Sequence, residues 1–214
     1  MKGKIINSNV QGIFATPIYF SELERSLTEK ENNFINKIKE QTYMNSLGGR
    51  NETSEDSYVL EKKELINLKK DLLLRVNDYF DKIEKPVQKI KPYITQSWLN
   101  INKNGTYHYE HSHPNSYLSG VFYVNSYQND DSINFKESKY TQINLGTRKN
   151  YNPFNSREWT FYVKTGAIIM FPSYLKHSVN LNQRSNHERI SLAFNIFMKG
   201  AIGDKKRLTE LILK

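Results

Sequence analysis

The fold is decided by the alternating stretch Glu188-Arg-Ile-Ser-Leu-Ala-Phe-Asn-Ile-Phe-Met198. Successive side chains of a β-strand point to opposite faces, so a period of two predicts a strand. One face of this strand would carry only apolar residues and pack into a core: Ile190, Leu192, Phe194, Ile196 and Met198. The opposite face would meet water or line a polar cavity, and it carries Arg189, Ser191, Ala193 and Asn195.

Seven more segments of the same kind come before this one. They are short, rich in β-branched and aromatic residues, and separated by turn residues. Their bounds are Tyr93–Ile101, Thr106–Ser112, Tyr117–Asn125, Ser132–Phe135, Trp159–Val163, Ala167–Pro172 and His177–Asn180. Eight short strands with almost no helical interruption predict a mainly β fold, a cupin-like jelly-roll or a related barrel. The long polar connection 136–157, with Tyr140, Arg148 and Trp159 near its ends, is expected at the mouth of a site, where it would help to choose a substrate.

The first part of the chain is predicted to support this barrel. Ile13–Phe20 is an extended apolar stretch, but Pro17 restricts it to the edge of a sheet. Thr28 and Glu31 form a capping box, which predicts a helix that continues to about Gln41.

A second helix is predicted from about Leu60 to Lys85, because apolar residues recur there at helical spacing and Pro86 ends the pattern. The segment Asn45–Ser57 between the two helices is interpreted as a loop. A short basic helix is expected after Gly203. We therefore expect one domain over 1–214, with supporting elements in 1–92, a jelly-roll core in 93–198 and a helical tail in 199–214.

The composition restricts the chemistry. The absence of cysteine excludes disulfides, zinc–thiolate sites, iron–sulfur clusters and thiol catalysis. No apolar run approaches the ~18 residues of a membrane span, and no apolar signal segment follows the first residues, so we expect a cytoplasmic protein without membrane contact. The formal net charge of +9 would favour an anionic partner, but the basic residues are scattered and no nucleic-acid motif accompanies them. Nucleic acid is therefore an unfavoured alternative, and the oligomeric state is not indicated.

Histidines form the most informative cluster. Three of the five lie within Tyr107-His-Tyr-Glu-His-Ser-His-Pro114. In an extended chain His111 and His113 point the same way, about 7 Å apart. With His177, which follows a neighbouring strand, they could hold one metal ion. His187 lies in a polar loop and is interpreted as solvated.

The polar face of the last strand suggests a second ligand. Arg189 and Ser191 lie two residues apart, and on a cavity face they could bind a carboxylate through charge-assisted hydrogen bonds. On an outward face, Arg189 would instead be a solvated surface side chain. The sequence leaves both options open.

The motifs together resemble the 2-oxoglutarate/Fe(II)-dependent oxygenases, and most closely a subfamily from bacteria and marine phages. The similarity covers roughly residues 93–198, and the opening Phe14-Ala-Thr-Pro-Ile-Tyr19 is similar too. It rests on Trp98-Leu-Asn100, Gly105-Thr-Tyr107, His111-Ser-His-Pro114, Ser119-Gly-Val-Phe-Tyr-Val124, Phe171-Pro-Ser173 with His177, and Arg189-Ile-Ser-Leu-Ala-Phe-Asn195.

This resemblance implies a double-stranded β-helix that is a dioxygenase, hydroxylates an unidentified small or macromolecular substrate, and uses Fe(II) and 2-oxoglutarate. It implies that His111 and His177 bind the metal, with His113 in the position that usually holds a carboxylate. Arg189, helped by Ser191, would bind the distal carboxylate of 2-oxoglutarate. The pocket would also be lined by Tyr107, Asn100, Tyr123 and Asn195.

Three alternatives follow from the same residues. His108-Tyr-Glu110 is a rival metal motif that would restore the carboxylate. The histidine spacing also fits a three-histidine cupin, which would use oxygen without 2-oxoglutarate. A metal-binding jelly-roll without catalysis is the third interpretation.

Overall fold

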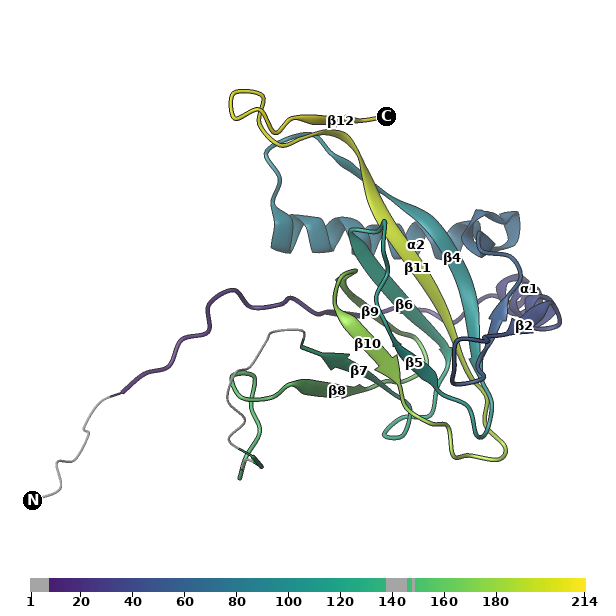
Figure 1. Cartoon of the computed structure of the whole chain (residues 1–214). Coiled ribbons are helices and arrows are strands. Elements are labelled where there is room, and N and C mark those ends of the chain that lie inside the picture. The colour runs from purple at the N-terminus through teal and green to yellow at the C-terminus, as the bar shows by residue number, and fades with distance from the viewer. Residues whose placement is uncertain (1–7, 138–145, 148) are drawn as a thin grey trace, which may run out of the picture.

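Two antiparallel sheets face each other in the computed structural model, which describes residues 8–137, 146–147 and 149–214 (Figure 1). The larger sheet has the order β1-β9-β6-β11-β4-β3-β2, and β12 pairs with β11. The smaller sheet has the order β5-β10-β7-β8. Facing antiparallel sheets of this kind form a jelly-roll, so the predicted mainly β fold is confirmed.

All eight predicted strands are present, with ends shifted by a few residues. They are β4 (Lys91–Asn102), β5 (His108–His111), β6 (Leu118–Asn125), β7 (Ser132–Lys136), β8 (Glu158–Tyr162), β9 (Ala167–Pro172), β10 (Lys176–Val179) and β11 (Arg189–Ile202). The predicted edge strand is β1 (Tyr19–Glu22), which begins after Pro17 and lies at one edge of the larger sheet.

The helices cover the outer face of the larger sheet (Figure 1). The capping box at Thr28 is formed and opens α1 (Glu29–Lys39). The predicted second helix is three consecutive helical pieces after a separate short turn: η1 (Val59–Glu61), then η2 (Lys63–Leu65), α2 (Ile66–Tyr79) and the π-helical η3 (Phe80–Glu84). Their apolar side packs on the predicted core face of β11, from Ile190 to Met198.

A smaller apolar cluster lies between the two sheets, around Tyr123, Ile133, Phe135, Ile169 and Phe171. It fills the end where β6 and β9 face β7. At the other end β4 and β11 face β5 and β10, and there the inward side chains are mostly polar. The space between the sheets therefore has an apolar half and a polar half.

Two predictions about the flanking segments were wrong. Asn45–Ser57 contains the turn and the second strand of a hairpin: β3 (Glu52–Ser54) pairs with β2 (Thr42–Met44), which comes just before this segment, and with the edge of β4, which offers free hydrogen-bonding groups. The helical tail is instead a turn followed by β12 (Leu211–Leu213), because β11 continues to Ile202 and β12 pairs with its end. No helix among the described residues is long and apolar enough to cross a membrane.

Candidate metal centre

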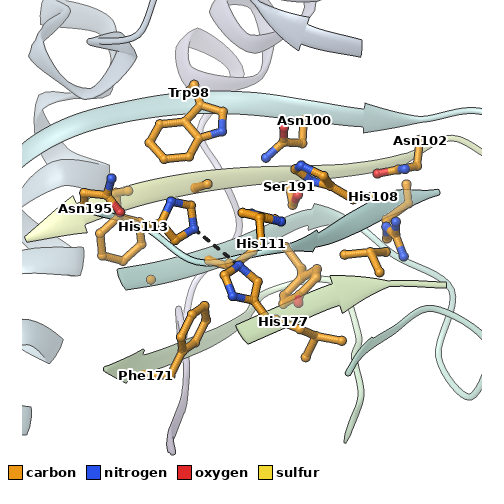
Figure 2. A pocket seen from close by; sticks show the side chains of 18 residues that line it. Trp98, Asn100, Asn102, His108, His111, His113, Phe171, His177, Ser191 and Asn195 are labelled. Atoms are coloured by element: carbon orange, nitrogen blue, oxygen red, sulfur yellow. Dashed lines mark hydrogen bonds between the residues drawn. The ribbon is translucent and has the colours of Figure 1, made fainter. Parts of the chain in front are cut away.

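Three histidines from the smaller sheet converge on the polar half of the interior (Figure 2). His111 ends β5, His177 lies on β10 directly opposite it, and His113 lies two residues beyond the strand. The backbone N–H of His113 donates to the carbonyl of Ser173, which fixes the turn that returns its side chain to the group. The ligand atoms of the three side chains all lie within 4.8 Å of one another.

The ring orientations of two of these histidines place the lone pair on Nε2, the atom that would bind a metal ion. Nδ1 of His111 lies 2.8 Å from the carbonyl oxygen of Tyr109, and Nδ1 of His177 lies 3.0 Å from that of Leu175. A carbonyl can only accept, so each Nδ1 carries the proton and each Nε2 has a lone pair. Metal-binding histidines in proteins are held by the same kind of backbone contact.

The third histidine completes the group through its Nε2. That atom of His113 lies 3.3 Å from Nε2 of His177. Three imidazole nitrogens therefore face one point from three backbone positions.

Burial keeps these imidazoles neutral. Desolvation is the largest cause of a lowered pKa at all three residues. The pKa of His111 is lowered, that of His113 falls to about 4, and that of His177 falls well below 6.5. Repulsion between neighbouring histidines lowers the pKa of His113 and His177 further. Neutral imidazole is the form that binds metal ions, so the group needs no deprotonation near neutral pH.

A β-bulge brings a fourth histidine to the same face. Between His177 and Val179 of β10 the partners on β5 move from His111 to His108, so β5 contains one extra residue there. His108 consequently lines the cavity and stacks on His111 with ring centroids 4.3 Å apart. Burial is the largest cause that lowers the pKa of His108 to about 3, and electrostatic interaction with His111 and Arg189 lowers it further.

The wall opposite the histidines is built by β4 and β11. Their register pairs Arg189 with Asn102, Ser191 with Asn100, and Ala193 with Trp98, all on the cavity face. Arg189 is only 2% exposed, and its Nη2 has no hydrogen-bond partner among the described residues. Its nearest acidic group is Asp131, with Oδ1 3.9 Å from Nη1, too far for a hydrogen bond. Burial lowers the pKa of Arg189, and the charge of Asp131 acts in the opposite direction.

The amide of Asn100 is oriented by the hairpin that the sequence did not indicate. Its Oδ1 accepts from the hydroxyl of Thr53 at 3.3 Å and, at 3.5 Å, from the amide of Asn51. Its nitrogen is thereby directed into the cavity, as Figure 2 shows. At the other end of the wall, Asn195 is held by the hydroxyl of Ser119 at 2.9 Å.

Most of the predicted site residues are brought together. The cavity is lined by His111, His113, His177, Arg189, Ser191, Asn100, Tyr123 and Asn195. Tyr107 is an exception, because it is 43% exposed and lies outside the cavity. The backbone N–H of Tyr107 donates to the carbonyl of Gly49, which holds it there. The structure therefore contradicts a pocket-lining role for Tyr107.

Two further expectations change. Glu110, the carboxylate of the rival motif, lies on the other face of β5 and forms ion pairs with Lys136 and Lys176, so it is absent from the histidine group. His187 is not simply solvated: its Nε2 lies 2.7 Å from Oδ2 of Asp131.

Of the residues named for the long connection, Tyr140 and Arg148 lie outside the described residues. Trp159 lies on β8, is 38% exposed and does not line the cavity.

Two contributors, Asn102 and Asp131, were missed in the sequence, and His108 was considered only as part of the rival metal motif. Asn102 shares the parity of Asn100 on one strand, so strict alternation could have identified it. His108 depends on the bulge, and Asp131 depends on how a turn packs against β11; neither leaves a local signal.

Comparison with known proteins supports this architecture. Residues 96–195 match the model of the family described as "Putative 2OG-Fe(II) oxygenase". This match confirms the resemblance to the 2-oxoglutarate/Fe(II)-dependent oxygenases. Comparison with the curated proteins finds no match.

Several solved structures share the fold. HygX of Streptomyces hygroscopicus, in a structure with nickel, 2-oxoglutarate and hygromycin B bound, has a TM-score of 0.57 and 12% identity over 85% of this chain and 82% of its own. A prolyl-4-hydroxylase of Pseudomonas putida has a TM-score of 0.55 and 10% identity, over 84% and 92%. SnoN, an alpha-ketoglutarate-dependent epimerase from nogalamycin biosynthesis, has a TM-score of 0.58 and 8% identity, over 85% and 78%. At these identities the likeness shows the fold alone.

Proposed function

We propose that this chain, whose residues 96–195 match the 2OG-Fe(II) oxygenase family, is an oxygenase that uses Fe(II) and 2-oxoglutarate to hydroxylate a substrate. The observation that carries the proposal is the pairing of two features in one cavity. Three neutral imidazoles face one point, and a buried guanidinium with an unpartnered N–H lies on the opposite wall.

The histidine group fits a ferrous ion. Imidazole suits iron among the transition metals, and three side chains on one side leave other coordination positions for small ligands. His111, His113 and His177 would hold the ion, each through Nε2. Glu110 has no part in this set because its carboxylate is engaged by two lysines on the other face.

The opposite wall fits a dianionic cosubstrate. A buried, unpartnered Arg189 N–H is costly unless an acceptor occupies the cavity, and a carboxylate is the acceptor that a guanidinium binds best. The charges support the same ligand. Three neutral imidazoles leave the two positive charges of a ferrous ion uncompensated, and 2-oxoglutarate brings two negative charges. Asp131 meanwhile balances Arg189.

When bound, the ion and 2-oxoglutarate supply the oxidising chemistry, in which 2-oxoglutarate becomes succinate and carbon dioxide while oxygen is transferred to the substrate. The residues of this chain bind and orient. Arg189 and Ser191 hold the distal carboxylate, and the backbone carbonyls of Tyr109 and Leu175 keep two imidazoles in the metal-binding tautomer. The surrounding apolar cluster, which includes Phe171 and Tyr123, limits access of water.

The test is anaerobic titration of Fe(II) followed by 2-oxoglutarate. We expect a weak metal-to-ligand charge-transfer band, and succinate on admission of oxygen. His177→Gln should abolish metal binding, whereas the matched variant His187→Gln, another partly buried histidine, should retain it. Arg189→Met should bind metal but require far more 2-oxoglutarate, and the surface variant Arg184→Met should behave like the wild type. Absence of the band in the wild type, or an Arg189→Met protein that titrates like it, contradicts the proposal.

A second candidate is a three-histidine dioxygenase that uses oxygen without 2-oxoglutarate. The absence of a carboxylate from the described histidine group favours it. It predicts tight iron binding and substrate oxidation with no succinate. A metal-binding module without catalysis would bind iron tightly but oxidise no substrate.

A further inference from the structure

We propose that Asn102 is a second donor to the distal carboxylate of the cosubstrate, so that Asn102 and Arg189 together select a 2-oxo diacid over a 2-oxo monoacid. This inference rests on the proposed function. It goes beyond the Arg189–Ser191 pair because it assigns a binding role on the neighbouring strand.

The register places the two side chains together. Asn102 ends β4 and is the direct cross-strand partner of Arg189 at the start of β11. Directly opposite residues of an antiparallel pair project to the same face with Cβ atoms roughly 5 Å apart. Both residues line the cavity, and Asn102 is labelled at the end of the wall beside His108 in Figure 2.

Both side chains have an unused donor. Asn102 is 1% exposed and Arg189 is 2% exposed, so water does not solvate either one freely. Nδ2 of Asn102 and Nη2 of Arg189 have no hydrogen-bond partner among the described residues. Native proteins leave few buried donors unpaired, so two on adjacent residues of one cavity wall indicate a shared acceptor that binds there.

The neighbouring groups restrict the chemistry of that acceptor. The backbone carbonyl of Asn102 accepts from the amide of Asn182 at 2.8 Å, which fixes the end of β4. The carboxylate of Asp131 comes within 3.9 Å of Nη1 of Arg189, whereas Nη2 has no partner among the described residues and is left for a ligand. An amide N–H and a guanidinium N–H side by side match the two oxygens of one carboxylate. The remainder of such a ligand would extend past Ser191 toward the histidines.

The experiment measures binding of two probes to the metal-loaded protein under anaerobic conditions by calorimetry. One probe is 2-oxoglutarate. The other is 2-oxopentanoate, which has the same chain length and the same keto acid but lacks the distal carboxylate. The variant Asn102→Leu keeps the side-chain shape and removes both polar atoms. Asn102→Asp keeps the shape and replaces the donor with a negative charge.

We expect Asn102→Leu to weaken 2-oxoglutarate binding about tenfold or more, as for loss of a hydrogen bond to a charged group, with 2-oxopentanoate affected less than about twofold. Asn102→Asp should weaken 2-oxoglutarate binding further by repulsion. The exposed variant Asn186→Asp, which adds the same charge near Arg189 in sequence, should not. Thermal unfolding checks that each variant is folded, and Asn102→Ala replaces Asn102→Leu if that protein does not fold.

The outcomes separate the two proposals. If the wild type binds 2-oxoglutarate through Arg189 but Asn102→Leu binds it equally well, the role of Asn102 is refuted and the proposed function stands. Equal weakening of both probes also refutes it, because that result indicates a displaced wall. If the wild type binds neither probe, the proposed function itself fails.

Discussion

Gly120 lies where any side chain would collide with the core, so Gly120→Ala is a direct test of how β6 and β11 pack. The two strands pair Gly120 with Phe194. A Cβ built on Gly120 would lie 2.3, 2.5 and 2.9 Å from three carbon atoms of the Phe194 ring. Phe194 has no exposed surface, so its ring cannot swing into solvent to relieve the contact.

The expected cost follows from two opposing effects. Overpacking of a fully enclosed ring costs about 3 kcal/mol, the upper end of the usual range. Alanine in place of glycine recovers about 0.4–1 kcal/mol, because the unfolded chain loses freedom. The net loss in the free energy of unfolding is therefore about 2 kcal/mol, which corresponds to a Tm roughly 4–8 °C lower for a chain of this size.

The assay is urea denaturation of a double-mutant cycle. In a Phe194→Ala background the ring is gone, so adding Gly120→Ala should stabilise the protein by about 0.4–1 kcal/mol, and the two changes should be coupled by about 3 kcal/mol. Additive costs would show that the contact with Phe194 is not what requires glycine. Because Val121, which follows Gly120, lines the cavity, the single variant is also expected to weaken 2-oxoglutarate binding.

Three further outcomes are expected. The pKa of His108 is lowered to about 3, so between pH 6.5 and pH 3 the unfolded chain binds a proton at this residue and the folded chain does not. The free energy of unfolding therefore falls as the pH drops from 6.5 toward 3. His108→Phe should reduce the slope of that free energy against pH by up to about 1.4 kcal/mol per pH unit. Asp131→Asn keeps a hydrogen-bond acceptor for the groups around it but removes the charge 3.9 Å from Arg189, so the unliganded protein should lose about 1–3 kcal/mol of stability. Its Tm should then rise more than that of the wild type when 2-oxoglutarate and metal are added. An equal ligand-induced gain would contradict that reasoning. Gly49→Ala should loosen the hairpin and increase proteolytic cleavage near residues 45–51, because its Cβ would lie 2.1 Å from the Tyr107 carbonyl at a φ of +78°; protection equal to the wild type would contradict this.

The elements that could be predicted are those with a repeating pattern of apolar residues or a helix-capping motif in the sequence. The alternation from Arg189 to Met198 predicted both faces of β11, and the capping box at Thr28 predicted where α1 begins. The errors occurred where pairing decides structure. β3 and β12 are three residues long and have no pattern of their own, so they exist because β4 and β11 offer hydrogen bonds.

The same distinction applies to the site. His111, His113 and His177 could be proposed from spacing, because the residue type carries the chemistry. The choice between His113 and Glu110 needed the backbone: the bulge and the turn after β5 bring His113 inward and leave Glu110 with two lysines. Tyr107 was misplaced because the hairpin that pins it was not predicted.

The two faces of β11 have a consequence for how such a protein can diversify. The even-numbered positions from 190 to 198 are constrained by packing in the core. The odd-numbered positions Arg189, Ser191, Ala193 and Asn195 are constrained by the ligand in the cavity. Substitutions at these odd-numbered positions can be sampled with little penalty to the helix-covered core. A library of variants at those four positions and at their partners on β4 would therefore change the ligand preference while the core and the fold stay unchanged.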